Sequence, residues 1–262
     1  MNQILKDICK KKEEQLEILK SKCSQKSLEK LLPSKKNRNF KSTIQLSQKN
    51  KKNNIIAEIK KSSPSAGVII KDYKPDDIAI QYEKSGAGAI SILTETFFFN
   101  GHIDHLSLIN TKTNIPILRK DFIIDHYQIF ESKVYKADAI LLITTILNDF
   151  KIKEFINIAN DIGLDCIVET HTPEEIKRAV NINYPLIGIN NRNLDTLSID
   201  TNNVTELIKD LTADFTIIGE SGIKNKSVIE LYNDFGIYNF LIGEALLKTN
   251  NIEVKIKEFL KK

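Results

Sequence analysis

Short apolar runs recur along the chain from residue 55 to residue 243, and amphipathic segments separate them. Each run is five to seven residues long, which is a usual length for a buried strand. The runs are IIAEIK (55–60), AISILT (89–94), PILRK (116–120), DAILLIT (138–144), DCIVET (165–170), PLIGIN (185–190), FTIIGES (215–221) and NFLIG (239–243). The pattern predicts eight strands.

The segments between these runs have the spacing of amphipathic helices. Phe155, Ile156 and Ala159 illustrate the period, and Gly163 follows where that helix should end. The run 172–175, Thr-Pro-Glu-Glu, is typical of a helix start. Eight strand–helix units in roughly 200 residues predict an α/β fold, a (β/α)₈ TIM barrel.

A doubly wound open sheet is the alternative architecture. Such a sheet normally carries a glycine-rich turn after its first strand to bind a dinucleotide. The sequence contains no GxGxxG motif, so the barrel is favoured.

The first 50 residues follow a different pattern. Apolar positions from Ile4 to Leu28 recur near helical spacing among many Lys and Glu residues. We therefore expect a helix over residues 4–31, followed by a loop around Pro33. We expect residues 1–50 to form an N-terminal helical extension packed on the barrel, and residues 51–262 to form the barrel catalytic domain, within a single domain overall.

Composition narrows the functional class. The formal net charge is only +4 and the lysines are spread along the chain, which favours solvated surfaces over a nucleic-acid interface. Cys9, Cys23 and Cys166 are odd in number and lack metal-ligand spacing, as expected in a reducing compartment. We see no signal peptide and no apolar stretch of about 18 residues. A cytoplasmic enzyme without a membrane or nucleic-acid partner is expected.

Polar side chains occupy the last inward position of several predicted strands. They are Glu58, Lys60, Lys120, Glu169, Asn190 and Glu220. A barrel brings the carboxyl ends of its strands to one mouth, where barrel enzymes keep their chemistry. Opposite charges at close range can provide a proton donor and a proton acceptor near neutral pH. A lysine could instead form a Schiff base, so an aldolase-like lyase stays open.

Two further signals predict a phosphorylated ligand with a flat apolar group. Ser221 and Gly222 follow the seventh strand, and Gly243 follows the eighth. Backbone N–H groups at this end of a barrel often bind phosphate. Three consecutive phenylalanines, residues 97–99, follow the second strand, and Phe122 follows the third. One regular face cannot bury all of them, so at least one is expected to line a pocket.

Read together, these motifs resemble the indole-3-glycerol phosphate synthase family. The segment IIAEIKKSSPSAGVI is similar to the family's signature and is highly specific. SILTETFFFNG, PILRKDFI, DAILLIT, IVETHT, IGINNRNL, IIGESGI and FLIGEALL follow in the family's order and spacing. The resemblance covers nearly the full length of the chain.

The resemblance implies a TIM-barrel carbon–carbon lyase, a carboxy-lyase of tryptophan biosynthesis that needs no metal and no organic cofactor. Members convert 1-(2-carboxyphenylamino)-1-deoxyribulose 5-phosphate to indole-3-glycerol phosphate, CO₂ and water. By resemblance, Lys120 is the general acid on the ketone oxygen and Glu169 a second proton-transfer residue. Lys60 lies near the substrate carboxylate, and Glu58 orients the lysines and assists dehydration. Asn190 and Glu220 hold the sugar hydroxyls and the charged intermediate.

The remaining implied site residues bind the two ends of the substrate. Positions around the phosphate are Ser63, Ser221, Gly222 and Gly243, with Pro64 and Glu244 beside them. Positions around the anthranilate ring are Phe99, Phe122, Leu141, Leu194 and Leu241, and Arg192 is a support residue on the carboxylate side. The expected partner is a small phosphorylated substrate, and the protein is expected to be a monomer or a weak homo-oligomer.

Two other readings stay open at this point. The chain could be a related phosphate-binding barrel, such as an isomerase or a Schiff-base lyase. It could also be a catalytically dead barrel that binds a phosphorylated metabolite or a partner protein. A dead barrel should have lost Lys120 or Glu169, and both are present. His102 and His105 lack an evident third ligand nearby, so we do not predict a metal site.

Overall fold

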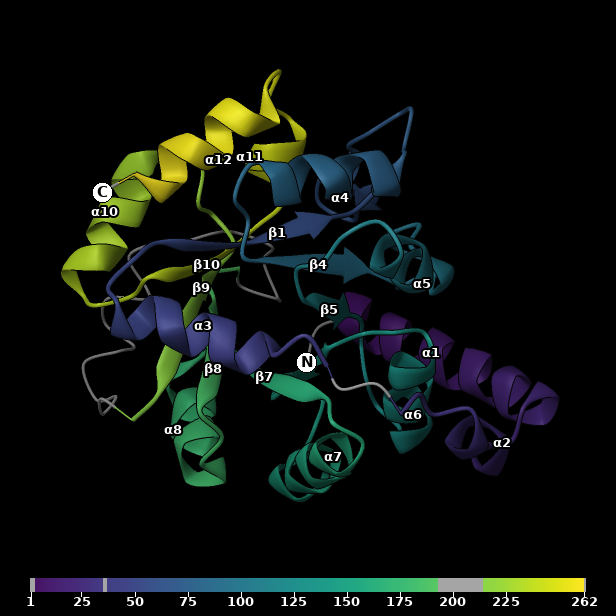
Figure 1. The fold of residues 1–262 in the computed structure, drawn as a ribbon. Helices are drawn as coiled ribbons and strands as arrows, with labels where there is room; N and C mark the ends of the chain where they lie inside the picture. The colour runs from purple at the N-terminus through teal and green to yellow at the C-terminus, as the bar shows by residue number, and fades with distance from the viewer. Residues whose placement is uncertain (1–2, 35–36, 193–213, 262) are drawn as a thin grey trace.

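The computed structural model describes residues 3–34, 37–192 and 214–261. Eight parallel strands of this part of the chain form one closed barrel, with helices around its outside (Figure 1). In chain order they are β1 (Asn54–Ile59), β4 (Ala89–Leu93), β5 (Ile117–Lys120), β6 (Ala139–Ile143), β7 (Asp165–Thr170), β8 (Leu186–Asn190), β9 (Thr216–Glu220) and β10 (Asn239–Ile242). The predicted TIM barrel is confirmed, and each predicted run matches one strand to within one residue at either end.

The barrel closes where β1 pairs with both β4 and β10. Helices follow the strands as α4 (Pro75–Lys84), α5 (Asp104–Asn110), α6 (His126–Val134), α7 (Asp149–Asp161), α8 (Pro173–Ile182), α10 (Lys226–Asp234), α11 (Glu244–Leu247) and α12 (Ile252–Leu260). The predicted start of α8 is observed, because Thr172 caps it by accepting from the backbone N–H of Glu175. Gly163 follows α7 with a φ of 69°, a left-handed conformation that favours glycine.

The N-terminal extension differs from the single predicted helix over 4–31. Helix α1 (Gln3–Lys22) ends early, and α2 (Gln25–Lys30) begins after Ser24. The Ser24 side chain accepts a hydrogen bond from the backbone N–H of Ser27. This N-cap bonds a backbone N–H group that would bond within the helix if the helix were continuous. Ser24 therefore ends one helix and starts the next, although it fits the helical pattern of the sequence.

Helix α3 (Phe40–Lys49) was not predicted from the sequence. It contains only two fully buried apolar residues, Phe40 and Ile44, so its periodic signal is weak. The helix packs on the barrel, where the Asn239 side chain donates to the backbone oxygen of Ile44 over 3.1 Å. The loop after β1 also forms an unpredicted two-stranded hairpin, β2 (Ser62–Ser63) with β3 (Gly67–Val68).

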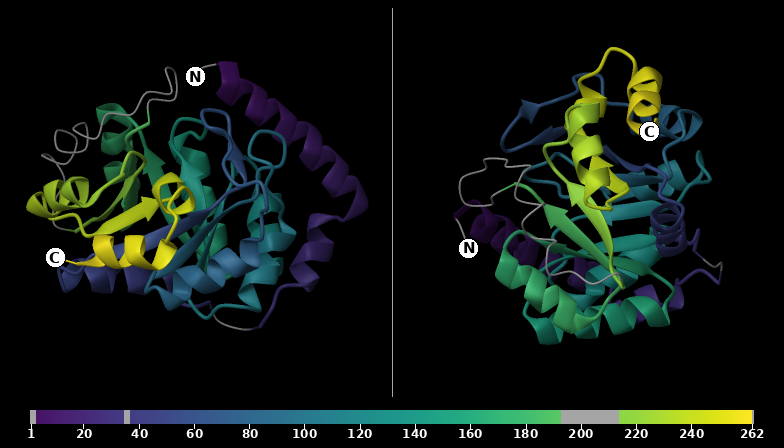
Figure 2. Two further views of the ribbon diagram at one scale, coloured as in Figure 1. Left: turned by 90° about the horizontal axis from the view of Figure 1, so that it is seen from above. Right: turned by 90° about the vertical axis from the view of Figure 1, so that its left-hand side faces the viewer.

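Helix α1 lies along the outside of the barrel, far from α12, in both views of Figure 2. Leu16 and Leu28 of the extension pack with Tyr127 of α6 in a small apolar cluster. The larger core contains the side chains of the strands and of the inner faces of the barrel helices. No helix in the described part of the chain is long and apolar enough to cross a membrane.

Candidate active site

A cavity of about 490 Å³ opens at the carboxyl ends of the barrel strands. All six polar strand-end residues predicted to meet there line it: Glu58, Lys60, Lys120, Glu169, Asn190 and Glu220. Five of them lie in β1, β5, β7, β8 and β9, and the sixth, Lys60, directly follows β1. The strands bring together residues that are far apart in the sequence, as the alternation of inward and outward side chains predicts.

Lys120, the last residue of β5, lies between two buried carboxyl groups. Its Nζ is 3.0 Å from Oε2 of Glu169 and 2.8 Å from Oε2 of Glu220. Gly188 of β8 leaves the room for Glu220, because a Cβ there would lie 2.3 Å from Glu220 Oε1. The Lys120 ammonium group thus pairs with two carboxyl groups at once.

The three groups shift one another's pKa. Burial acts to lower the pKa of Lys120, but the carboxylates of Glu169 and Glu220 raise it overall. Burial acts to raise the pKa of Glu169, whereas Lys120 and His171 lower it overall. Glu220 is different, because burial together with the nearby Glu169 raises its pKa despite Lys120. Lys120 therefore carries a positive charge, and the two carboxyl groups differ in their proton affinity.

Glu58 and Lys60 form a second ion pair at the end of β1. Glu58 is 4% exposed, so its charge needs a partner. Gly243 allows the carboxylate to approach the end of β10, because a Cβ at that position would lie 2.2 Å from Glu58 Oε1. We name these two residues, with Lys120, Glu169 and Glu220, the acid–base cluster.

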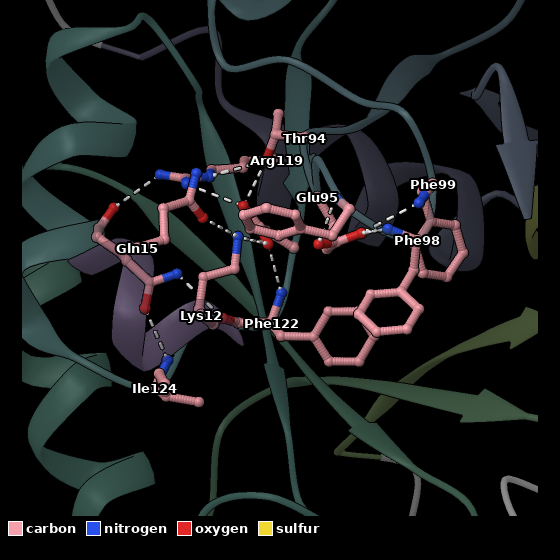
Figure 3. Close-up of polar contacts among 12 residues, drawn as sticks. Lys12, Gln15, Thr94, Glu95, Phe98, Phe99, Arg119, Phe122 and Ile124 are labelled. Atoms are coloured by element: carbon pink, nitrogen blue, oxygen red, sulfur yellow. Dashed lines mark hydrogen bonds and ion pairs between the residues drawn. The ribbon is translucent and has the colours of Figure 1, made fainter. Parts of the chain in front are cut away.

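An apolar wall faces this cluster. The rings of Phe99 and Phe122 have centroids 6.2 Å apart, and both line the cavity with the predicted residues Leu141 and Leu241. Glu95 fixes the phenylalanine loop, since its carboxylate accepts from the backbone N–H groups of residues 97, 98 and 99 at 2.7–3.1 Å (Figure 3). Phe97 points to solvent and is 53% exposed. Only part of the triplet serves the cavity, as expected.

Left-handed backbone forms another part of the cavity lining. Ser221 and Gly222 have φ values of 63° and 81°, and Gly243 immediately precedes the short helix α11. Ser63 and Pro64 of the loop after β1 line the same cavity. Concave backbone of this kind presents N–H groups to anions.

Two more of the predicted residues, Arg192 and Glu244, also line the cavity. The backbone N–H of Arg192 donates to Asn190 Oδ1 over 3.0 Å. Glu244 pairs with Lys248 at 2.6 Å. Leu194 lies outside the described residues.

The sequence analysis missed contributions from helix α1. Ile4, Leu5 and Ile8 line the cavity, although their helical spacing indicated only a packed face. Ser65, Lys224 and Lys248 are further cavity residues that were not predicted. Ser65 lies within the segment IIAEIKKSSPSAGVI but was not singled out, and no strand-end position or motif marks Lys224 or Lys248.

An unpredicted cluster of buried ions attaches α1 to the barrel beside this cavity. Lys12 of α1 is 2.9 Å from Asp121, which is 2.9 Å from Arg119. Arg119 in turn pairs with Glu131 of α6 at 2.8 Å. Figure 3 shows Lys12 and Arg119 approaching each other from α1 and β5. We name Lys12, Arg119, Asp121 and Glu131 the buried ion cluster.

Neither cluster resembles a metal centre. Within residues 3–34, 37–192 and 214–261, no three His, Cys, Asp or Glu side chains are grouped so that they could hold a metal ion. Lysine and glutamate side chains at these distances can transfer protons and stabilise charge.

A TIM barrel that gathers lysine and glutamate side chains, an apolar wall and left-handed backbone around one cavity at its mouth has the arrangement of a barrel enzyme. The indole-3-glycerol phosphate synthase family model matches residues 5–259. The chain belongs to the indole-3-glycerol phosphate synthase family, carboxy-lyases of tryptophan biosynthesis.

Individual relatives support this assignment. The chain is 42% identical over 260 residues to the indole-3-glycerol phosphate synthase of Legionella pneumophila (strain Paris), covering 99% of both chains. It is 46% identical over 205 residues to the synthase of Endomicrobium trichonymphae, covering 78% of this chain and 80% of the relative.

Solved structures support the fold alone. A 3-hexulose-6-phosphate synthase has a TM-score of 0.64 at 10% identity, covering 79% of this chain and 97% of the other. The N-acetylmannosamine-6-phosphate 2-epimerase of Clostridium perfringens has a TM-score of 0.57 at 17% identity, covering 76% and 89%.

Proposed function

We propose that this protein converts 1-(2-carboxyphenylamino)-1-deoxyribulose 5-phosphate to indole-3-glycerol phosphate by lysine and glutamate acid–base catalysis. The observation that carries the proposal is Lys120, bridged by Glu169 and Glu220 and facing a wall that contains Phe99 and Phe122. A flat anthranilate ring and a ketone that must be protonated match these two sides of the cavity.

Ring closure is the first chemical step. Lys120 donates a proton towards the ketone oxygen as the ring carbon that bears the carboxylate attacks the carbonyl carbon. The two flanking carboxylates raise the pKa of Lys120, so the lysine is charged at neutral pH and stabilises the oxygen as its negative charge grows. A charged lysine is also a poor nucleophile, which argues against the Schiff-base lyase.

Loss of CO₂ and of water completes the conversion. The bond to the carboxylate carbon breaks, and its electron pair restores electrons to the ring system. Loss of the new hydroxyl group as water then needs a proton on oxygen and removal of one from carbon. Glu169 serves this second proton transfer, and Glu58 assists the dehydration.

The two ends of the substrate are held by different parts of the cavity. The phosphate binds the backbone around Ser221, Gly222 and Gly243, with Ser63 on the other side. Lys60, supported by Arg192, faces the anthranilate carboxylate. Binding at both ends folds the flexible sugar chain so that the ring carbon approaches the ketone.

The N-terminal extension, residues 1–50, is part of the same catalytic unit in this proposal. Ile4, Leu5 and Ile8 line the cavity, and Lys12 pairs with Asp121, the residue next to Lys120. The barrel, residues 51–262, supplies all the proton-transfer groups. The extension closes the side of the cavity next to β5.

The direct test is incubation of the purified protein with the carboxyphenylamino-deoxyribulose phosphate. Indole fluorescence should appear together with CO₂ in equal amounts. Borohydride should trap no substrate adduct on Lys60 or Lys120. Turnover without CO₂ release, or a trapped adduct, would contradict the proposal, and tight binding without turnover would indicate a catalytically dead barrel.

A further inference from the structure

The two carboxyl groups beside Lys120 have different second neighbours. Oε1 of Glu169 lies 3.3 Å from Nε2 of His171. Oε1 of Glu220 is buried and has no hydrogen-bond partner among the described residues. Glu169 therefore lies between two cationic groups, whereas Glu220 has only Lys120 at such a distance.

His171 is fixed by groups outside the cavity. Its Nδ1 lies 3.3 Å from both Glu175 Oε2 and Thr145 Oγ1, and its backbone N–H donates to Glu175 Oε2 over 2.7 Å. The Thr145 hydroxyl donates to Glu175 Oε1 over 2.6 Å. Glu175 belongs to the first turn of α8, so this helix holds the ring against the end of β7.

The environment of the ring favours its charged form. The side chain is 5% exposed and lies between the carboxyl groups of Glu169 and Glu175. Burial acts to lower the pKa of His171, but these two carboxylates raise it to about 9. Nε2 lies 3.3 Å from Oε1 of Glu169, so this carboxylate favours the charged ring both as a nearby acceptor and through its charge.

We propose that His171, as an imidazolium ion, is a positioning residue that keeps Glu169 ionised and leaves the spare proton on Glu220. This inference rests on the proposed function, because Glu169 must act as the base in it. The groups that face His171 are Glu169 from β7, Glu175 from α8 and the uncharged Thr145 after β6. Lys120 of β5 faces Glu169 from its other side.

Loss of the imidazolium charge should reduce the difference between the two carboxyl groups. A proton would then be held more equally by Glu169 and Glu220, and fewer molecules would have Glu169 ready to accept one. His171 does not line the cavity, so the change should affect kcat and its pH dependence rather than KM.

Two substitutions separate charge from geometry. His171→Leu removes the charge and the donor, whereas His171→Gln keeps a donor without a charge. We expect both to shift the acidic limb of the kcat profile about one pH unit upwards, which lowers kcat about tenfold on that limb and little on the plateau, with KM nearly unchanged. Recovery of the normal profile by His171→Gln would show a merely geometric role and overturn the proposal. His102→Leu, at a surface position 55% exposed, is the matched control.

A second measurement does not depend on turnover. NMR titration of protein labelled with ¹⁵N-histidine should show His171 titrating well above the ordinary value for histidine, and His105 below it. Glu169→Gln and Glu175→Gln should each lower the His171 midpoint. A midpoint below pH 7 in the unsubstituted protein would overturn the proposal even if the enzyme is active. An inactive protein with a high His171 midpoint would instead contradict the proposed function and leave the imidazolium in place.

Discussion

Three consecutive residues at the end of β5 belong to two different groups of charges. Arg119 and Asp121 lie in the buried ion cluster between β5, α1 and α6, whereas Lys120 points into the cavity. Strand alternation places neighbours on opposite faces. The same strand end thus supplies both a structural and a chemical cluster.

The buried ion cluster is balanced and its polar atoms are satisfied. It contains two cations, Lys12 and Arg119, and two carboxylates, Asp121 and Glu131. Asp121 also accepts from the Thr94 hydroxyl over 2.7 Å and from the backbone N–H of Phe122 over 2.8 Å. Asp121 also borders the cavity, but its side chain is fully buried among these partners.

The acid–base cluster, counted with the groups in direct ion-pair contact with it, is not balanced. Lys60, Lys120 and His171 face four carboxyl groups, those of Glu58, Glu169, Glu175 and Glu220. Burial of an unpaired negative charge is unfavourable, so one carboxyl group retains a proton. The comparison shows how similar residues can serve two purposes. A buried cluster with equal numbers of positive and negative groups stabilises the fold, whereas a cluster with an extra carboxyl group keeps a proton that can be transferred.

The largest expected effect is at Lys120. Lys120→Ala should lower kcat by about 10³-fold or more, since it removes the acid on the ketone oxygen. The fold should persist, because Glu169 can take up a proton when the ammonium group is lost, with Glu220 already protonated. Fluorescence assays and circular dichroism measure the two quantities, with exposed Lys112→Ala as control. Near-normal kcat would remove Lys120 from the proposed chemistry.

Substitution of Asp121 should affect the stability of the fold more than kcat, in contrast to substitution of Lys120. Asp121→Ala leaves Lys12 and Arg119 close together and buried, so we expect a loss of about 3–5 kcal/mol in the free energy of unfolding. Urea unfolding tests this, and Glu253→Ala in the exposed pair with Lys257 should leave the urea midpoint unchanged. If Asp121→Ala were no more destabilising than Lys120→Ala, the distinction between the clusters would fail.

Glu169 should again change chemistry more than stability. Glu169→Gln should lower kcat by about 10²-fold or more through loss of a proton-transfer group. It also removes one carboxyl group from a region that has an excess of them, so the free energy of unfolding should stay equal or rise. An unchanged kcat would exclude Glu169 from the mechanism, and a large loss of stability would mean that its charge is structural.

The sequence predicted the barrel and the acid–base cluster because both follow from local rules. Apolar runs mark the strands, and alternation identifies the inward residue at each strand end, as for Lys120 and Glu169. The same rule fixes Arg119 on the outer face. These positions depend on the backbone period and not on which helices pack nearby.

The buried ion cluster and His171 could not be predicted in this way. Lys12 lies in a helix with many lysines, and its pairing with Asp121 depends on how α1 packs against β5. His171 follows Glu169 in the sequence, but its charge depends on Glu175 reaching back from α8. Ser24 divides the predicted first helix through a side-chain cap. Each depends on tertiary geometry that periodicity does not encode.

The smallest effect that we predict is a difference in the pH dependence of stability between Asp121 and Glu220. Lys12 and Arg119 overcome the effect of burial and lower the pKa of Asp121 from 3.8 to about 2. This stabilisation is present above pH 3.8 and is lost as the pH falls to about 2, and it corresponds to about 2 kcal/mol. Asp121→Asn should therefore reduce the acid dependence of unfolding in that range.

Glu220 should behave with the opposite sign. Burial raises its pKa above 4.5, so the folded state binds more protons than the unfolded state and its stability falls as the pH rises from that value. Glu220→Gln should remove this decline and stabilise the protein at neutral pH. Urea unfolding of both variants from pH 2 to pH 8 tests the pair. Parallel curves for Asp121→Asn and Glu220→Gln would show that the two clusters do not differ in charge balance.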